Sequence, residues 1–210
     1  TSTGSMSYSG FIGRLNAKGV IKNLTLGANC RMTFWANSGG ISGYVAGRIE
    51  NCVFLGTVRG MSSNIGGIAG QIQRTTGVVS GCRNDGRILS GGNYPGGIAG
   101  YINNGPVVGD SINPAHKAIS AGNNAGGIVG NLNGGKVLYC VNQGSVSSSR
   151  VCGGIYGYNS GAVNVISCLN TGTVNGGKGY ATGAIGGDKP GSTGVLENNY
   201  YDGQLLTAGA

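Results

Sequence analysis

The sequence predicts an all-β protein folded as a parallel β-solenoid, most simply a right-handed β-helix of about seven coils with a 27–30 residue repeat. A short glycine motif returns at that interval along the chain. Within each repeat, apolar residues alternate with a period of two, as they do in strands. The 46 glycines among 210 residues oppose helices by about 1 kcal/mol each. These three observations favour stacked strands over helices.

The glycine motif marks the first strand of each repeat. In one copy, Ile68, Gly70 and Ile72 fall on the same face of an extended chain, and other copies keep this spacing. We expect the inward glycine where two backbones approach closely at a bend. The copies read SGFIG (9–13), GGISG (39–43), GGIAG (66–70), GGIAG (96–100), GGIVG (126–130), GGIYG (153–157) and TGAIG (182–186).

A second strand, about a dozen residues further on, has the pattern aliphatic-x-x-Cys in four coils. Stacking would place these cysteines in one interior column, where small thiols fill the core. In-register stacking gives parallel Cβ vectors rather than disulfide geometry, so we expect free thiols. The column comprises Cys52, Cys82, Cys140 and Cys168, and Leu24, Ser111 and Asn198 replace cysteine in the other coils.

A third strand follows an asparagine that stands two residues past the cysteine position. These asparagines predict a second interior column, because stacked carboxamides can hydrogen-bond along the rod. Its members are Asn84, Asn113, Asn142 and Asn170. The repeat thus contains about three short strands separated by Gly, Asn and Ser turns.

We expect one solenoid domain over residues 1–210, with an N-terminal cap at 1–9, stacked coils at 10–197 and a C-terminal cap at 198–210. Caps are expected because an open solenoid exposes unpaired strand edges. Met6 and Tyr8 could fold over the first coil, and Tyr200 or Tyr201 could cover the last.

The repeat resembles the GLUG motif, a Gly-Leu-x-Gly signature of bacterial secreted and surface proteins, including some IgA-peptidase-type and adhesin-associated proteins. Ile takes the Leu place in five copies, and Phe11 and Ala184 occupy it in the end copies. The resemblance covers nearly all of 10–205. It implies an extracellular or cell-surface repeat region, often suspected of adhesion, with flanking domains in a longer chain.

Composition argues against several other classes. The net charge of +8 is spread from Arg14 to Lys189 without a basic run or interleaved aromatics, so no nucleic-acid partner is expected. No apolar run reaches about 18 residues, so we expect no membrane span. His116 is the single histidine and no C-x-x-C pair occurs, so we expect neither a metal site nor a cofactor.

Paired carboxylates, which glycoside hydrolysis requires, are scarce. Three of the six carboxylates, Glu50, Asp85 and Asp110, fall in different coils at positions that do not match. The other three share the last coil and are Asp188, Glu197 and Asp202. We therefore assign no catalytic residue. A polysaccharide-active enzyme centred on the last coil is kept as an alternative.

Two columns next to the motif are expected to face outward. In the first, Tyr44, Tyr101 and Tyr158 recur every second coil with Gln71 and Asn131 between them, an arrangement that could stack on sugar rings and bond their hydroxyls. The second is unusually apolar for a wet face, so we expect a partner surface to cover it. It comprises Ile12, Ser42, Ala69, Ala99, Val129, Tyr156 and Ile185.

The sequence thus favours a non-enzymatic extracellular rod of a bacterial surface or secreted protein, acting as a stalk or in adhesion. The alternative is a carbohydrate-binding module that uses the tyrosine column. The expected partners are host or cell-wall glycans, or another protein surface.

Overall fold

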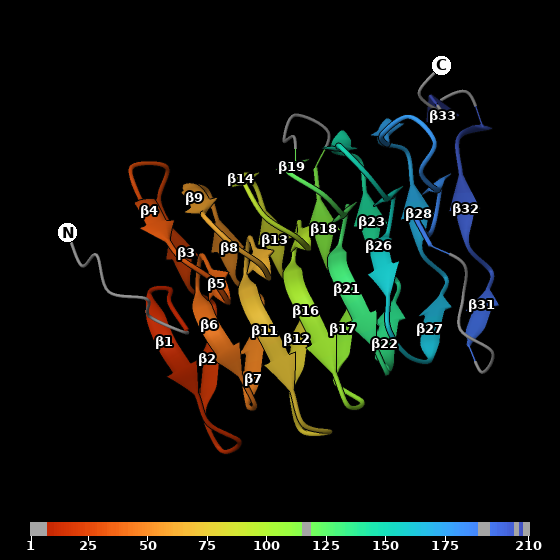
Figure 1. The fold of residues 1–210 in the computed structure, drawn as a ribbon. Coiled ribbons are helices and arrows are strands. Elements are labelled where there is room, and N and C mark those ends of the chain that lie inside the picture. Colours follow the sequence, from red (N-terminus) through yellow and green to blue (C-terminus); the bar gives the residue numbers. More distant parts are fainter. Residues whose placement is uncertain (1–7, 115–118, 189–193, 204–205, 208–210) are drawn as a thin grey trace.

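The computed structural model describes residues 8–114, 119–188, 194–203 and 206–207. Its chain winds into a parallel β-solenoid whose coils follow one another from the N-terminal to the C-terminal end (Figure 1). Each sheet takes one strand from each coil, and neighbouring strands pair in parallel. The predicted fold class is confirmed, and the described strands form sheets of six or seven strands, in line with about seven coils.

We number the five sheets I to V in the order in which one coil visits them. Sheet I contains β5 (Ser38–Gly39), β10 (Ile65–Gly66), β15 (Pro95–Gly96), β20 (Ala125–Gly126), β25 (Cys152–Gly153) and β30 (Thr182–Gly183). Sheet II contains β1 (Ile12–Leu15), β6 (Ser42–Val45), β11 (Ala69–Gln73), β16 (Ala99–Asn103), β21 (Val129–Asn133) and β26 (Tyr156–Asn159). Sheet III contains β2 (Val20–Lys22), β7 (Arg48–Glu50), β12 (Val78–Ser80), β17 (Val107–Gly109), β22 (Gly135–Leu138), β27 (Val163–Ile166) and β31 (Val195–Glu197).

The remaining two sheets complete each coil. Sheet IV contains β3 (Thr25–Leu26), β8 (Val53–Phe54), β13 (Arg83–Asn84), β18 (Ile112–Asn113), β23 (Val141–Asn142), β28 (Leu169–Asn170) and β32 (Tyr200–Tyr201). Sheet V contains β4 (Arg31–Phe34), β9 (Thr57–Gly60), β14 (Arg87–Ser90), β19 (Ile119–Ala121), β24 (Val146–Ser148), β29 (Val174–Asn175) and β33 (Leu206–Thr207).

A coil therefore has five short strands rather than the predicted three. The sequence pattern merges sheets I and II, which are divided at the glycine bend, and sheets III and IV, which are divided by a left-handed turn. Left-handed turns recur at two places in the coil. One precedes sheet I, where Asn37, Asn64 and Tyr94 have positive φ. The other lies between sheets III and IV, at Asn23, Asn51, Gly81, Asp110, Tyr139, Ser167 and Asn198. Asparagine and glycine tolerate this backbone conformation best, and most of these positions carry one of the two.

The interior is filled by columns of aliphatic side chains. The isoleucine of the glycine motif is fully buried in five successive coils. The central aliphatic residues of the sheet III strands form a second buried column, which comprises Ile49, Val79, Val108, Val137 and Val165. The motif column comprises Ile41, Ile68, Ile98, Ile128 and Ile155. Because every coil contributes equivalent residues, the core runs the length of the rod.

The glycine pair of the motif is required by space rather than by φ. A Cβ on Gly67 would lie 2.4 Å from Cγ of Asn84, and one on Gly66 would lie 2.0 Å from the carbonyl oxygen of Ala69. The third motif glycine is equally confined, since a Cβ on Gly70 would lie 2.3 Å from the carbonyl carbon of Asn37. Sheets I and II therefore meet with their backbones nearly in contact.

This close approach overturns one expectation. The apolar column predicted to face outward is in register from Ile12 to Tyr156, and Gly186 instead of the predicted Ile185 continues it. Its members Ser42, Ala69, Ala99, Val129 and Tyr156 are all buried within the rod. The prediction was wrong because simple strand alternation ignores the glycine bend, which folds the sheet I strands against those of sheet II. Ile12, in the first coil, is 36% exposed and is the exception among the paired members of this column.

The ends continue the sheets. Ser9 forms a parallel bridge with Ser38, so the first coil already begins inside the predicted N-terminal cap, of which residues 1–7 lie outside the described residues. At the other end, β32 and β33 extend sheets IV and V, and Tyr200 and Tyr201 are 66% and 52% exposed. These tyrosines pair in a sheet instead of covering the last coil.

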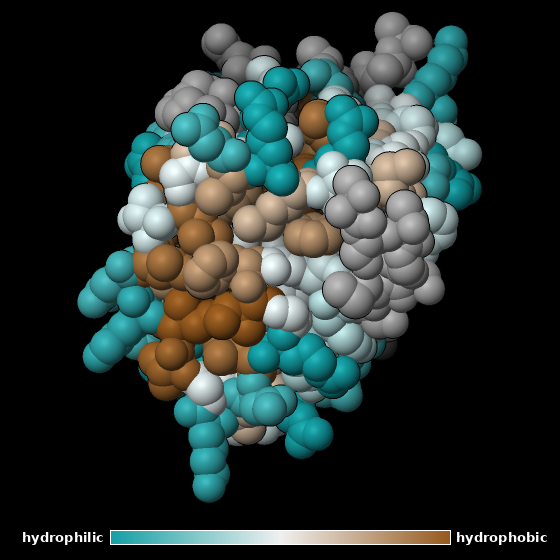
Figure 2. All heavy atoms as spheres, turned by 90° about the vertical axis from the view of Figure 1, so that its left-hand side faces the viewer, coloured by the Kyte–Doolittle hydropathy of each residue, from teal (hydrophilic) through white to brown (hydrophobic). Residues whose placement is uncertain are grey.

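The first coil presents an apolar surface at the N-terminal end of the rod (Figure 2). Phe11, Val20 and Trp35 are more than half exposed there. In the part of the chain that the structure describes, no helix has the length and apolar character needed to cross a membrane.

Candidate functional site: the tyrosine and asparagine face

The tyrosine column predicted from the sequence lies on sheet II in the predicted register. Strand pairing aligns, coil by coil, Arg14, Tyr44, Gln71, Tyr101, Asn131 and Tyr158. One coil separates each neighbour from the next, which corresponds to about 4.8 Å.

Burial within this column is uneven. Tyr44, Gln71 and Asn131 are 7%, 6% and 6% exposed, whereas Tyr101 and Tyr158 are half-buried. An open ladder of five binding residues is therefore not present. Tyr8 and Tyr94, which pack on members of the column, lie outside it, so the motif spacing alone did not reveal them.

At the N-terminal end, Tyr44 is enclosed by two neighbours. Its ring meets that of Tyr8 edge to face at a centroid distance of 5.2 Å. The guanidinium of Arg14 lies 4.6 Å from the Tyr44 ring centroid and 4.7 Å from that of Tyr8. This cation–π arrangement packs the first two coils together and leaves Tyr44 little surface for a ligand.

The accessible rings gather further along the rod. Tyr94, from the left-handed turn before β15, packs on Tyr158 with a centroid distance of 5.6 Å and an interplanar angle of 33°. Burial raises the pKa of the Tyr94 phenol, and the neighbouring Tyr158 adds to that rise. Sequence reasoning missed Tyr94, although it occupies the position held by Asn37 and Asn64 in earlier coils.

Side-chain amides frame these rings. Asn133 donates hydrogen bonds to the Tyr101 hydroxyl at 3.0 Å and to Oδ1 of Asn103 at 2.8 Å. Ser160 donates to Oδ1 of Asn131 at 3.0 Å. Rings that offer flat apolar faces, bordered by amides that both donate and accept, suit ligands with alternating C–H and hydroxyl groups. We call this surface the tyrosine–amide face; it comprises Tyr94, Tyr101, Tyr158, Asn103, Asn131, Asn133 and Ser160.

The cysteines of the predicted column are fully or almost fully buried, and all six cysteines of the chain are free. This column also forms hydrogen bonds between coils, because a backbone N–H of one coil donates to the column side chain of the next coil. Cys140 donates in this way to Sγ of Cys168 at 3.4 Å, and Cys82 to Oγ of Ser111 at 3.2 Å. In the last coil the acceptor is Asn199, at 2.9 Å from the nitrogen of Cys168, so Asn199 holds the cysteine position that the sequence pattern assigned to Asn198.

Burial favours the protonated thiol at Cys82 and Cys140. It raises the pKa of Cys82 to about 12, and it raises the pKa of Cys140 well above the usual range. A buried neutral thiol is a poor nucleophile and a poor metal ligand. The cysteine column therefore contributes packing and hydrogen bonds.

The asparagine column forms a chain of hydrogen bonds along the interior. Asn84 donates to Asn113 at 3.3 Å, Asn113 to Asn142 at 2.8 Å, and Asn142 to Asn170 at 2.8 Å. All four side chains are buried. The chain starts after the second coil, where Phe54 fills the equivalent position.

Two of the six carboxylates are engaged in ion pairs. Glu50 and Asp85 form ion pairs with Arg48 and Arg83. In the last coil, Glu197 ends β31 of sheet III and Asp202 follows β32 of sheet IV. Among the residues that the structure describes, which exclude His116, no three His, Cys, Asp or Glu side chains gather as metal ligands would.

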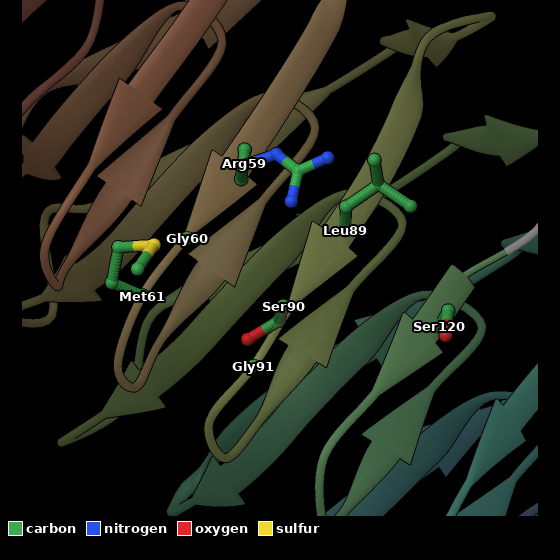
Figure 3. A pocket seen from close by; sticks show the side chains of 7 residues that line it. All are labelled: Arg59, Gly60, Met61, Leu89, Ser90, Gly91 and Ser120. Atoms are coloured by element: carbon green, nitrogen blue, oxygen red, sulfur yellow. The ribbon is translucent and has the colours of Figure 1, made fainter.

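A hollow that the sequence did not indicate lies on sheet V. It has a volume of about 330 Å³ and is lined by Arg59, Gly60, Met61, Leu89, Ser90, Gly91 and Ser120. Figure 3 shows the side chains of Arg59 and Leu89 projecting from the neighbouring strands β9 and β14, with Met61 beyond the end of β9. Alignment of the coils would have brought these residues together.

The chain matches no protein-family model, no curated protein and no solved structure. The repeat architecture and the surfaces described above are therefore the basis for assigning a function.

Proposed function

We propose that this chain is a non-enzymatic rod of repeated coils in a secreted or surface protein of a bacterium, with a structural role in a stalk or in adhesion. The observation that carries the proposal is the continuity of the interior. Apolar, thiol and carboxamide columns join each coil to the next, so the rod holds its outer faces at fixed spacings.

The arrangement of acidic groups supports a role without catalysis. Glu50 and Asp85 form ion pairs with Arg48 and Arg83. In the last coil, Glu197 ends a strand of sheet III and Asp202 follows a strand of sheet IV. Hydrolysis of a glycosidic bond needs two carboxyl groups held about 5–10 Å apart, one of them protonated. The GLUG resemblance is consistent with this proposal, because such repeats accompany functional domains.

Removal of one coil tests the structural role. Deletion of 68–97 joins Gly67 to Ile98, which occupies the same place in the repeat as Ile68. We expect a folded rod that is shorter by about 4.8 Å in small-angle X-ray scattering and still melts cooperatively. Incubation of the intact chain with pectin and alginate should release no reducing ends or unsaturated products. Product release would overturn the proposal, as would a deletion variant that cannot fold.

A carbohydrate-binding role is a second candidate, favoured by the tyrosine–amide face. Tyr94 packs on the half-buried ring of Tyr158, and Asn133 donates to the hydroxyl of the half-buried Tyr101. Such a cluster can bind a sugar ring through its C–H face while amides bond its hydroxyls.

A glycan array separates the two candidates. The wild type should bind neutral glycans, and the double variant Tyr94→Ala, Tyr158→Ala should lose that signal. Tyr139→Ala is the matched control, because Tyr139 is exposed on another part of the rod. The absence of signal from the wild type, or equal signals from all three proteins, would leave the structural role alone.

A further inference from the structure

Three arginines that are far apart in sequence come together on sheet V. Arg31 and Arg87 lie in one column, with Thr57 between them, and Arg59 lies on the intervening strand two residues past Thr57. Two coil spacings separate the Cα atoms of Arg31 and Arg87, which is about 10 Å. All three side chains are exposed.

These guanidiniums are available for a ligand. Among the residues that the structure describes, the ion pairs are Arg48 with Glu50 and Arg83 with Asp85, so the three sheet V arginines are outside both pairs. Arginine remains charged at all physiological pH values and binds carboxylates or sulfates through a planar fork of donors. Their proximity makes this part of the rod a local concentration of positive charge.

The hollow on sheet V adjoins this charge. Arg59 lines it together with Leu89, which is its neighbour in the ladder, and Met61, which is 56% exposed. Ser120 adds an exposed hydroxyl. A volume of about 330 Å³ lies at the small end of ligand sites and suits a single sugar ring. Apolar side chains can accept the ring's C–H face, while the guanidinium and hydroxyl take its polar groups.

We propose that the first four coils of sheet V bind an acidic polysaccharide, with one sugar ring in the hollow beside Arg59 and further carboxylate or sulfate groups on Arg31 and Arg87. A polymer fits better than a small anion because the cations are distributed over two coil spacings. A nucleic acid fits less well, because base binding uses successive aromatic side chains and this surface offers one strongly exposed aromatic residue, Trp35. The site is independent of the tyrosine–amide face on sheet II.

The test uses the full chain on immobilised polygalacturonate, which carries carboxylates, and on heparin, which carries sulfates. We expect binding to at least one of them, weakening as salt rises, and none to neutral dextran. The triple variant Arg31→Ala, Arg59→Ala, Arg87→Ala should lose roughly tenfold in affinity. Lys18→Ala, Lys22→Ala, Lys136→Ala is the matched control with the same loss of charge at exposed positions outside sheet V, and should change affinity less than about twofold.

Thermal melting of both triple variants checks that they fold like the wild type. Equal losses in the two triple variants would show a response to net charge and would overturn the proposal, as would failure to bind either polymer. Tighter binding to single-stranded DNA than to both polymers would overturn the assignment of ligand class. The double variant Tyr94→Ala, Tyr158→Ala should keep full binding to the acidic polymer, which separates this site from the sheet II candidate.

Discussion

Asn113 lies inside the interior asparagine chain, where its carboxamide both accepts and donates. It accepts from Asn84 and donates to Asn142, so replacement by alanine removes two hydrogen bonds at once. It also leaves a buried amide and a buried carbonyl oxygen without these partners. The cost of such a group is about 1–3 kcal/mol.

We therefore expect Asn113→Ala to lower the free energy of unfolding by about 3 kcal/mol, measured by urea titration. Asn29→Ala, at an exposed turn, is the control and should change it by less than about 0.5 kcal/mol. Similar values for the two variants would show that the asparagine chain does not contribute to stability.

The buried thiols predict a dependence of stability on pH. Burial raises the pKa of Cys82 to about 12 and that of Cys152 to about 11, from an ordinary value of 9.0. The folded state therefore keeps the proton more tightly than the unfolded state. The stabilisation is complete below pH 9 and is lost as the pH rises from 9 towards 11–12, by about 1.4 kcal/mol per pH unit for each thiol.

Urea titrations at pH 8, 9 and 10 under reducing conditions measure this slope. The double variant Cys82→Ser, Cys152→Ser should show a shallower decline than the wild type, because the two ionisations are removed. Asn29→Ala keeps every thiol and should retain the steeper decline. Parallel curves for all three proteins would contradict the prediction.

At this scale, the repeat pattern predicted the residues that stack in the interior but not every partner. Coil spacing identified the four asparagines, because equivalent residues in a solenoid share a column. It assigned the cysteine position of the last coil to Asn198 instead of Asn199, since the final coil differs in length by one residue at this point. The sequence did not reveal Tyr94 as part of the tyrosine–amide face, because its ring packs on Tyr158 in a later coil. Strand periodicity does not predict such contacts between non-equivalent positions.

Among the elements, the bend between sheets I and II is the feature that strand alternation does not predict. The paired motif glycines allow the two backbones to meet, and this contact buries a column expected to face solvent. The apolar composition of this column correctly indicates a covered surface. The cover is the chain itself and not a separate partner.

This bend predicts that a charge at Ala99 is not tolerated. Ala99→Lys would bury an ammonium group at a fully enclosed site, so we expect a loss of at least about 3 kcal/mol in stability, or no folded protein. Gln73→Lys, at a half-buried position on the neighbouring strand of sheet II, should remain folded. Melting temperatures from circular dichroism compare them. A stable Ala99→Lys variant would show that the column is accessible after all.

The whole molecule carries opposite charges at its two ends. The first coil contains Arg14, Lys18, Lys22 and Arg31 without a carboxylate, whereas the last coil contains Asp188, Glu197 and Asp202 with one cation, Lys189. Lys22 and Glu197 are the first and last residues of one column in sheet III. In the part of the chain that the structure describes, both end coils also expose apolar residues and leave strand edges unpaired, which favours pairing with another chain.

We therefore expect this chain to associate head to tail as its concentration rises, which sedimentation velocity would detect as growth in mass. Lys22→Glu should weaken association because it would set like charges at the junction. Lys136→Glu makes the same charge change in the middle of the rod and should leave association unaltered. A single monomeric species at all concentrations would count against this arrangement.

The solenoid itself was predictable from the sequence, because a period of 27–30 residues with strand alternation has few other physical solutions. The surface sites were not predictable from the sequence in the same way. The three sheet V arginines are separated along the chain by about one coil each, so they register in the sequence as dispersed charges and become neighbours only after stacking. Function at that scale depends on the alignment of coils.

The free cysteines make local opening of individual coils measurable by chemical labelling. Cys52, Cys82, Cys140 and Cys168 stand in four different coils and are shielded from solvent. A maleimide or disulfide reagent can reach each one only when its coil separates from a neighbour, so the labelling rate of each position records local opening. Mass spectrometry of partly labelled chains would therefore reveal whether fraying begins at one tip of the molecule or at both.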